Sequence, residues 1–187
     1  MRPMTADAKR GLRRELRARR LALADSRDLV ADDHAVADVV MATVARTGLR
    51  TGASVTLYES MPQEPPTGQA IAALQDAGFR VLVPITLPDL DLDWADAADP
   101  ERTPLGLAAI AEVDLVLAPG LSVDASGTRL GQGGGCYDKA LPRRARGTPV
   151  IVLLHPEEHP GPVLPRAAHD VPVDAVLTAE GVTPVAS

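Results

Sequence analysis

The stretch VDLVLAPGLSVDASGTRLGQGGGCYDKAL, residues 113–141, joins an apolar run to a glycine-rich loop. Its first part, residues 113–119, is almost entirely apolar and predicts a buried strand. Glycine occupies four of the five positions 131–135, and a helix is expected directly afterwards, over residues 135–144. Such a turn presents unpaired backbone N–H groups and the positive end of the helix dipole. The stretch therefore predicts an α/β fold with an anion-binding turn after a buried strand.

Other short apolar runs extend this interpretation along the chain. They are SVTLY (54–58), RVLVP (80–84), PVIVLL (149–154) and DAVLT (174–178). Most lack strict alternation of apolar and polar residues, which favours strands covered on both faces and a largely parallel sheet between helical layers. A helix expected over residues 67–77 alternates with these runs, as in an α/β fold. The polar, proline-broken segment between Pro84 and Pro104 predicts a short hairpin or a lid.

Two amphipathic helices are expected before the first strand, over residues 7–24 and 26–46. In the first, leucines lie near one side of a helical wheel and arginines on a neighbouring side. These residues are Leu12, Leu16 and Leu23, and Arg10, Arg13, Arg14 and Arg17. Ser26 is the expected N-cap of the second helix, and Gly48 is expected to end it. The first helix thus carries a basic stripe.

Composition is that of an ordinary globular protein, and 187 residues favour one domain, 1–187. The single cysteine, Cys136, excludes an internal disulfide and is consistent with a reducing, cytoplasmic location. A net charge of −6 and an aromatic content of 2% argue against nucleic acid as a partner. No apolar run approaches the roughly 20 residues that span a bilayer. We therefore expect neither nucleic-acid nor membrane partners.

Taken alone, the glycine cluster fits two kinds of structure. It is either a surface loop whose glycines satisfy unusual backbone angles or a loop that holds phosphate. Arg129 and Lys139 bracket it, and it lacks the serine and proline of a solvated linker, which favours phosphate. It matches neither a P-loop nor a first-turn dinucleotide motif. Asp138, in turn, either caps the following helix or holds Mg²⁺ beside the phosphates.

Residues 114–141 resemble the signature of the 5-formyltetrahydrofolate cyclo-ligase family, D-x-x-G-x-R-L-G-x-G-x-G-x-Y-D. The matching positions are Asp124, Gly127, Arg129, Leu130, Gly131, Gly133, Gly135, Tyr137 and Asp138. Further segments resemble family motifs in the expected order. KRGLRREL (9–16) resembles the ATP-contacting helix, ESMPQEPPT (59–67) the substrate-binding Glu-x-x-Thr segment, and HDVPVDAVLT (169–178) the His-Asp segment before the last strand.

The resemblance implies a three-layer α/β sandwich with a largely parallel central sheet, related to the sugar-phosphate isomerase and CoA-transferase folds. It implies conversion of 5-formyltetrahydrofolate to 5,10-methenyltetrahydrofolate, with hydrolysis of ATP to ADP and phosphate. ATP and Mg²⁺ are the implied cofactors, and the implied partner is this small-molecule substrate. We expect a monomer or a weak homodimer.

The resemblance also assigns residues to roles. The expected nucleotide-binding residues are Lys9, Arg10, Arg13, Arg129, Leu130, Gly131, Gln132, Gly133, Gly134, Gly135, Cys136 and Tyr137. The expected folate-binding residues are Glu59, Met61, Glu64, Trp94, Gln132, Gly133, Gly134, Gly135 and Cys136. Asp138 and Asp170 are the expected magnesium ligands, and Arg129 and Tyr137 the expected catalytic residues. Singly, the charged residues also fit a solvated helix face, a loop carboxylate or a turn cap, but their joint occurrence in family order favours a site.

The chain departs from the family pattern at Cys136, where the family often has an aromatic residue, and at PLGLAAIAEVDLV (104–116), which lacks a Glu-Pro pair. The alternative function is therefore a catalytically impaired nucleotide- or folate-binding protein of the same fold. No base accompanies Cys136 in the sequence, so we expect it to line the pocket rather than to act as a nucleophile. Prolines in HPEEHP (155–160) exclude the helix of a zinc motif and predict a loop.

Overall fold

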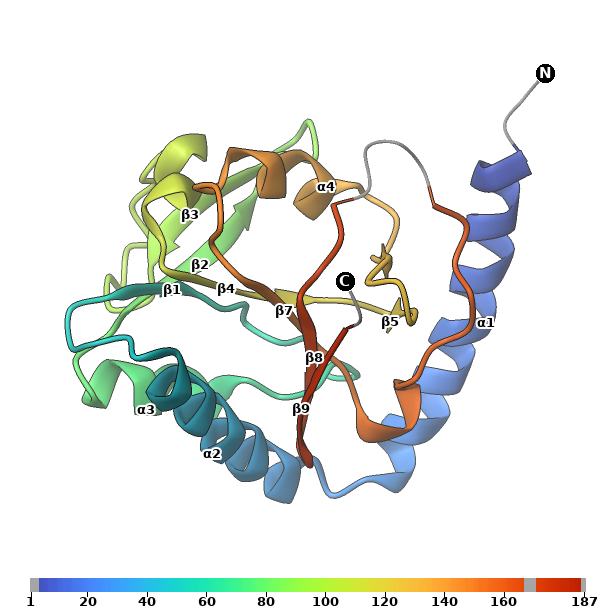
Figure 1. Cartoon of the computed structure of the whole chain (residues 1–187), viewed down its shortest axis with the longest axis horizontal. Coiled ribbons are helices and arrows are strands. Elements are labelled where there is room, and N and C mark those ends of the chain that lie inside the picture. Colours follow the sequence, from blue (N-terminus) through green and yellow to red (C-terminus); the bar gives the residue numbers. More distant parts are fainter. Residues whose placement is uncertain (1–3, 167–170, 186–187) are drawn as a thin grey trace.

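The computed structural model describes residues 4–166 and 171–185, which form a seven-stranded mixed sheet in the order β3-β2-β1-β4-β7-β8-β9 (Figure 1). The strands are β1 (Ser54–Thr56), β2 (Arg80–Thr86), β3 (Leu92–Asp96), β4 (Leu115–Pro119), β7 (Val150–Leu153), β8 (Ala175–Thr178) and β9 (Gly181–Pro184), and a separate hairpin pairs β5 (Ser122–Val123) with β6 (Arg129–Leu130). Strands β2, β1, β4, β7 and β8 run parallel to their neighbours in that row. They are the predicted apolar runs, so the largely parallel sheet is confirmed.

Both edge strands are antiparallel and come from segments that the apolar pattern did not identify. Segment 85–104 turns back on itself, and β3 pairs with β2 from Leu82↔Asp96 to Thr86↔Leu92. Of the two structures expected for this segment, the hairpin is confirmed. Strand β9 is the short run GVTP, which pairs with β8. With one glycine, one proline and one threonine among four residues, it carries no apolar pattern to detect.

Helices cover both faces of the sheet, which gives the expected three layers (Figure 1). One face carries α2 (Leu29–Thr47) and α3 (Gly68–Asp76), and the other carries α4 (Cys136–Ala140) with the 3₁₀ turns η1 (Leu107–Glu112) and η2 (Leu141–Arg143). The helix expected over residues 135–144 is divided between α4 and η2. Pro142 lies in the first turn of η2, and it has no N–H with which to continue the α-helical hydrogen bonds.

The first two helices are confirmed, but the expected cap is wrong. Helix α1 spans Met4–Ser26, and the Ser26 hydroxyl donates to the Leu23 carbonyl at 2.9 Å inside its last turn. Asp28 caps α2 instead, because its Oδ1 accepts from the N–H groups two and three residues further on, at 3.2 and 3.1 Å. Serine and aspartate both suit an N-cap, so residue type alone did not decide between these two positions.

The core lies on both sides of the sheet and is built mainly from aliphatic side chains. In β4, Leu115 and Leu117 belong to the cluster under α2 and α3, whereas Val116 belongs to the cluster under α4. All three are 0% exposed. Successive side chains of a strand point to opposite faces, so an unbroken apolar strand must be covered on both. The expectation of doubly covered strands is therefore confirmed here.

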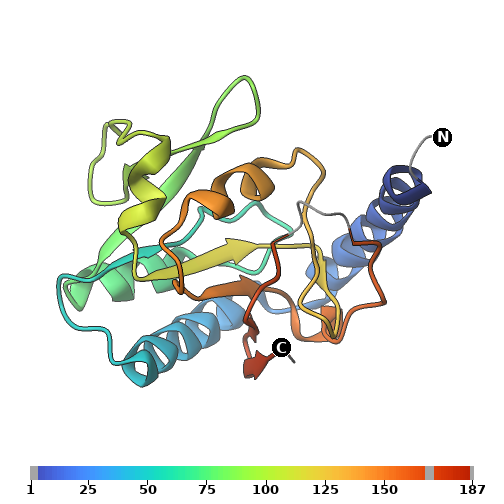
Figure 2. The same cartoon turned by 45° about the horizontal axis from the view of Figure 1, so that its top comes forward.

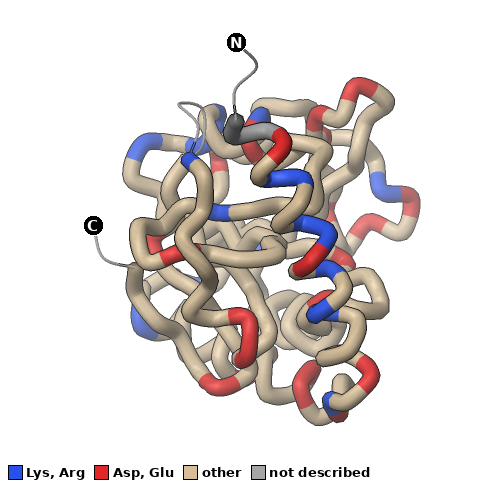
Figure 3. Tube along the Cα trace, turned by 90° about the vertical axis from the view of Figure 1, so that its right-hand side faces the viewer, with Lys and Arg blue, Asp and Glu red and all other residues tan. Residues whose placement is uncertain are grey.

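Helix α1 lies beside these layers, along the β5–β6 hairpin (Figures 1 and 2). Its Leu16 packs on Leu130 and Leu164. Basic residues follow one another along the exposed length of α1, as Figure 3 shows. Among the described residues, no helix has the length and apolar character that crossing a membrane demands.

Candidate active site

A cavity of about 300 Å³ lies at the carboxyl ends of the central strands. Strand β1 lies between β2 and β4 in the sheet. After β1 the chain first adds β2 on one side and later adds β4 on the other, so the direction in which strands are added reverses at β1. Such a switch point opens a crevice in which open α/β sheets bind ligands. The cavity is lined by Tyr58, Glu59, Met61 and Glu64 after β1, Pro84 and Thr86 of β2, Leu92 of β3, Pro119 and Gly120 at the end of β4, Arg13 of α1, Arg129, and residues 131–138.

The glycine-rich loop forms one wall of this cavity, and its backbone requires glycine. Gly133, with φ 117°, and Gly135, with φ 71°, lie in the left-handed region that side chains disfavour. A Cβ atom on Gly131 would lie 2.8 Å from Nη1 of Arg129. Because the loop is folded against a cavity, the structure favours a ligand-holding loop over a solvated linker.

Asp138 does not cap the helix that follows the loop. Gly135 occupies the N-cap position, and Asp138 lies in the first turn of α4. Its Oδ1 accepts a hydrogen bond from Nη2 of Arg129 at 2.6 Å, and its side chain is 27% exposed at the cavity. The cap alternative is therefore wrong, and the carboxylate is accessible to a ligand.

Arg129 is nearly buried in the wall between β4 and α4. Its side chain is 5% exposed, and Nη1 donates to the Pro119 carbonyl at 3.2 Å. Its Cζ lies 5.5 Å from the centroid of the Tyr137 ring, within the range of a cation–π interaction. Together with the Asp138 ion pair, these contacts fix a permanent positive charge beside the loop.

Tyr137 lines the cavity, but its hydroxyl is buried. That hydroxyl has no hydrogen-bond partner among the described residues. Burial raises the pKa of the phenol well above its ordinary value, and the nearby Arg129 opposes this only in part. Tyr137 is therefore a neutral phenol, and a catalytic role for its hydroxyl stays a prediction.

Two residues assigned to the site have side chains in the core. Trp94 is 0% exposed in the cluster under α4, where its ring meets Tyr137 edge-on at a centroid distance of 6.3 Å. The expected contact of Trp94 with folate is corrected, because α4 covers this part of β3; Leu92 of the same strand lines the cavity instead. Leu130 is 1% exposed and packs on Leu16 behind the loop.

The basic stripe of α1 reaches the loop through Arg13 and Arg17. Nε of Arg13 donates to the Gly131 carbonyl at 3.0 Å. Nε of Arg17 donates to Oε1 of Gln132 at 3.0 Å, and Nη2 of Arg17 donates to the Gln132 carbonyl. The sequence placed Arg17 in the stripe but not in the site; its position one helical turn after Arg13 was the available signal.

The other two basic residues expected at the nucleotide do not line the cavity. Arg10 is 78% exposed in its side chain and pairs with Asp7 at 3.2 Å. Lys9 is half-buried on α1, one turn before Arg13. Of these three expected contacts, the structure brings Arg13 to the cavity.

Residues 59–67 form the turn after β1 and bring acidic side chains to the cavity. Glu64 is 6% exposed, and its Oε2 accepts from the Met61 N–H at 3.1 Å. Glu59 is more exposed and pairs with Arg102 at 2.6 Å. All three residues expected to bind folate from this turn therefore lie at the cavity.

Asp138 offers a carboxylate that suits magnesium. The second expected ligand, Asp170, lies outside the described residues. Within residues 4–166 and 171–185, no group of three or more His, Cys, Asp or Glu side chains gathers in the manner of a metal site. Magnesium usually takes one or two carboxylates and completes its shell with phosphate oxygens and water, so one carboxylate beside an anion-binding loop fits this chemistry.

Comparison with known proteins covers most of the chain. Residues 5–179 match the model of the 5-formyltetrahydrofolate cyclo-ligase family. A 5-formyltetrahydrofolate cyclo-ligase of Mycolicibacterium smegmatis is 34% identical over 150 residues, which cover 71% of this chain and 77% of that protein. Solved 5,10-methenyltetrahydrofolate synthetases from Mycoplasma pneumoniae and Aquifex aeolicus share the fold at 20% identity, with TM-scores of 0.75 and 0.72; the matches cover 92% and 94% of this chain and 99% and 94% of theirs. The chain therefore belongs to the 5-formyltetrahydrofolate cyclo-ligase family.

Proposed function

We propose that this chain is a 5-formyltetrahydrofolate cyclo-ligase, which uses MgATP to form 5,10-methenyltetrahydrofolate, ADP and phosphate. The observation that carries the proposal is a single cavity with two kinds of wall. One wall is the glycine-rich loop with Arg13 and Arg129, and another is the turn with the nearly buried Glu64. An anion-binding loop suits a phosphate donor, and a buried carboxylate suits a heterocycle with adjacent N–H groups.

The proposed reaction requires alignment of two substrates more than a protein nucleophile. The formyl oxygen attacks the γ-phosphorus of ATP, and the bond from that phosphorus to the ADP oxygen breaks. N10 then attacks the carbon of the resulting N5-iminium phosphate and loses its proton, and the former formyl oxygen leaves as part of phosphate. Every bond that forms or breaks belongs to the substrates, so the protein contributes positioning and charge stabilisation.

The orientation of the loop peptides supports phosphate binding at the nucleotide wall. The carbonyls of Gly131 and Gln132 accept from the α1 residues Arg13 and Arg17. In a planar trans peptide the N–H points opposite to the C=O, so the N–H groups of Gln132 and Gly133 point away from α1. We assign these donors, with the Arg13 and Arg129 side chains, to the phosphate oxygens of ATP.

The turn after β1 is the proposed folate wall. The carboxylate of Glu64 is nearly buried and oriented by the Met61 N–H, which suits it to accept two neighbouring N–H groups of the pterin. Met61 is 51% exposed at the cavity, and its flexible thioether suits packing on a planar ring. Cys136 completes this side as a small lining residue.

We assign magnesium to Asp138 and Asp170. Bound Mg²⁺ neutralises charge on the transferring phosphoryl group. Asp138 is held by Arg129 at 2.6 Å, which fixes the direction of the carboxylate before any ligand arrives. Arg129 and Asp138 thus lie beside the glycine-rich loop with one positive and one negative charge.

We also propose that the protein works in the cytoplasm as a monomer or a weak homodimer. Its single cysteine, Cys136, supports a reducing compartment. Sedimentation at several protein concentrations tests the oligomeric state. A tight dimer at the lowest concentration would contradict this part of the proposal.

The test of the proposed function is a direct assay. Purified protein is incubated with 5-formyltetrahydrofolate and MgATP, and the absorbance of methenyltetrahydrofolate is followed, with reactions lacking ATP as the control. We expect ATP-dependent product with one ADP formed per turnover. Tight ATP binding without product would instead identify the catalytically impaired binding protein.

A further inference from the structure

A buried ion pair lies behind the cavity, between α1 and the 3₁₀ turn η3 (Pro156–Glu158). Nε and Nη2 of Arg20 donate to the two carboxylate oxygens of Glu158, each at 2.7 Å, and both side chains are 3% exposed. Nη2 of Arg20 also donates to the Gly120 carbonyl at 2.6 Å. Burying two charges costs about as much free energy as their attraction returns, so stability alone is a weak reason for this pair.

The ion pair is connected to the turn that carries Glu64. Oε2 of Glu158 accepts from the backbone N–H of His155 at 2.9 Å. Nε2 of His155 lies 3.1 Å from the Gln63 carbonyl, and because a carbonyl only accepts, Nε2 carries the proton. Gln63 directly precedes Glu64. Arg20 is therefore linked to the residue beside the proposed pterin ligand through Glu158 and through the backbone and ring of His155.

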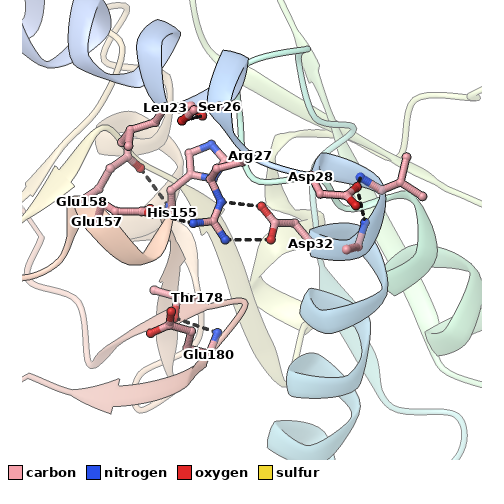
Figure 4. Close-up of polar contacts among 12 residues, drawn as sticks. Leu23, Ser26, Arg27, Asp28, Asp32, His155, Glu157, Glu158, Thr178 and Glu180 are labelled. Atoms are coloured by element: carbon pink, nitrogen blue, oxygen red, sulfur yellow. Dashed lines mark hydrogen bonds and ion pairs between the residues drawn. The ribbon is translucent and has the colours of Figure 1, made fainter.

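A second set of contacts also holds η3. Arg27, the residue after α1, pairs with Asp32 of α2 at 2.6 Å and with Glu157 at 2.6 Å (Figure 4). Arg19 of α1 donates to the Glu157 carbonyl at 2.5 Å. Helix α1 holds η3 directly and α2 holds it through Arg27, so these contacts fix the backbone of the turn from which the His155 side chain projects.

One end of this network lies in the cavity wall, and the other end lies next to a residue of that wall. At one end, Arg20 holds Gly120, which lines the cavity at the end of β4. At the other end, His155 holds Gln63, next to Glu64, which lines the cavity after β1. None of Arg20, Glu158 and His155 lines the cavity itself. A group that fixes two walls without touching the ligand is suited to positioning.

We infer that Arg20, Glu158 and His155 are positioning residues that set the folate-binding turn of this enzyme. They fix the Gln63 carbonyl, and thereby the direction of the Glu64 carboxylate, relative to Gly120 at the end of β4. The inference rests on the proposed function, because it gives these residues a role in binding 5-formyltetrahydrofolate. It predicts an effect on the folate substrate that spares ATP, whose proposed contacts lie on the glycine-rich loop.

The first experiment removes the contact between His155 and Gln63. We expect His155→Ala to raise the KM for 5-formyltetrahydrofolate by about tenfold, since one buried hydrogen bond is lost, and to leave the KM for ATP within about twofold. His155→Gln retains a side-chain N–H donor and is expected to recover most of the loss. His34→Ala, at an exposed position of α2, is the control and should change neither KM.

The second experiment separates positioning from stability. Arg20→Met alone leaves Glu158 buried without its partner and is expected to unfold readily. The double variant with Arg20→Met and Glu158→Met removes both charges and retains apolar volume, so we expect a Tm near that of the wild type together with the raised folate KM. A double variant with the wild-type folate KM would overturn the inference.

A measurement independent of turnover keeps the two proposals distinguishable. Amide hydrogen exchange reports the N–H groups of Met61 and Glu64, which are bonded within the turn. We expect His155→Ala to accelerate both and to leave the amides of β4 unchanged. If wild-type protein shows no cyclo-ligase activity but exchange accelerates, the proposed function fails and the positioning of the turn stands. If the wild type is active and exchange is unchanged, the inference fails alone.

Discussion

Nη2 of Arg129 lies 2.6 Å from Oδ1 of Asp138, across the start of α4. This pair places one positive and one negative charge next to the glycine-rich loop. The side chain of Arg129 is 5% exposed, whereas that of Asp138 is 27% exposed. The more exposed partner is therefore the one that is available to a metal ion.

The first prediction concerns this carboxylate. We expect Asp138→Asn to lower turnover by about 100-fold and to raise the Mg²⁺ concentration needed for half-maximal rate, because an amide is a weaker magnesium ligand. The amide oxygen still accepts from Arg129, but the nearly buried guanidinium loses its counter-charge, so we expect the Tm to fall by a few degrees while the protein stays folded. The rate is measured against Mg²⁺ concentration. Asp76→Asn, at an exposed position of α3, is the control, and an unchanged Mg²⁺ dependence in Asp138→Asn would refute the metal assignment.

The second prediction separates backbone strain from ligand binding. Gly133, with φ 117°, lines the cavity, and Gly147, with φ 88°, is exposed away from it. Alanine at either position forces a side chain into a disfavoured region, at a cost of about 1–3 kcal/mol. We expect both variants to lose stability in thermal unfolding, but only Gly133→Ala to raise the KM for ATP, by about tenfold. An equal KM for ATP in the two variants would show that the loop does not bind the nucleotide.

The sequence predicted what depends on local patterns. The apolar run that becomes β4, and the glycines that become the cavity wall, were identified because their signals lie within a few neighbouring residues. The burial of Trp94 was not predicted, since it depends on α4 lying over β3. Arg17 and Arg20 are both arginines of α1, but they contact different partners. Arg17 bonds to Gln132, 115 residues away in the sequence, and Arg20 bonds to Glu158, 138 residues away. No local pattern distinguishes them.

The third prediction concerns the turn between β2 and β3, which is tied to the other side of the site. Arg143 donates to both carboxylate oxygens of Asp91 at 2.7 and 2.6 Å, and Nζ of Lys139 donates to the Asp89 carbonyl at 2.6 Å. The hydrogen bonds from Arg143 lower the pKa of Asp91 from 3.8 to about 2. An acid whose pKa is depressed by folding stabilises the folded state above its ordinary pKa, and this contribution is lost as pH falls toward the folded value.

We therefore expect Asp91→Asn to lower the Tm by about 2 °C at pH 7 and by less as the pH approaches 2, where the wild type also loses the charge. Thermal unfolding at several pH values measures the difference. Asp89→Asn keeps an oxygen that accepts from the Asp91 N–H and leaves the pair of Asp91 with Arg143 in place, so it is the control. A constant difference between the wild type and Asp91→Asn down to pH 2 would show that the ion pair does not stabilise the turn.

The last prediction decides how Tyr137 takes part in the reaction. Its hydroxyl is buried without a partner among the described residues, whereas its ring lies against the Arg129 guanidinium at 5.5 Å. Removing an unsatisfied buried hydroxyl is neutral or stabilising, so Tyr137→Phe should keep the Tm or raise it. We expect the ring, rather than the hydroxyl, to position Arg129. Turnover of Tyr137→Phe should then stay within about twofold of the wild type. Tyr137→Leu should lose about tenfold in turnover, in line with a cation–π interaction of about 0.5–2 kcal/mol. Tyr58→Phe is the comparison, since the Tyr58 hydroxyl lies 3.5 Å from the Pro65 carbonyl. A large loss of kcat in Tyr137→Phe alone, at unchanged Tm, would show instead that the hydroxyl reaches the substrate, and that the site rearranges to expose it.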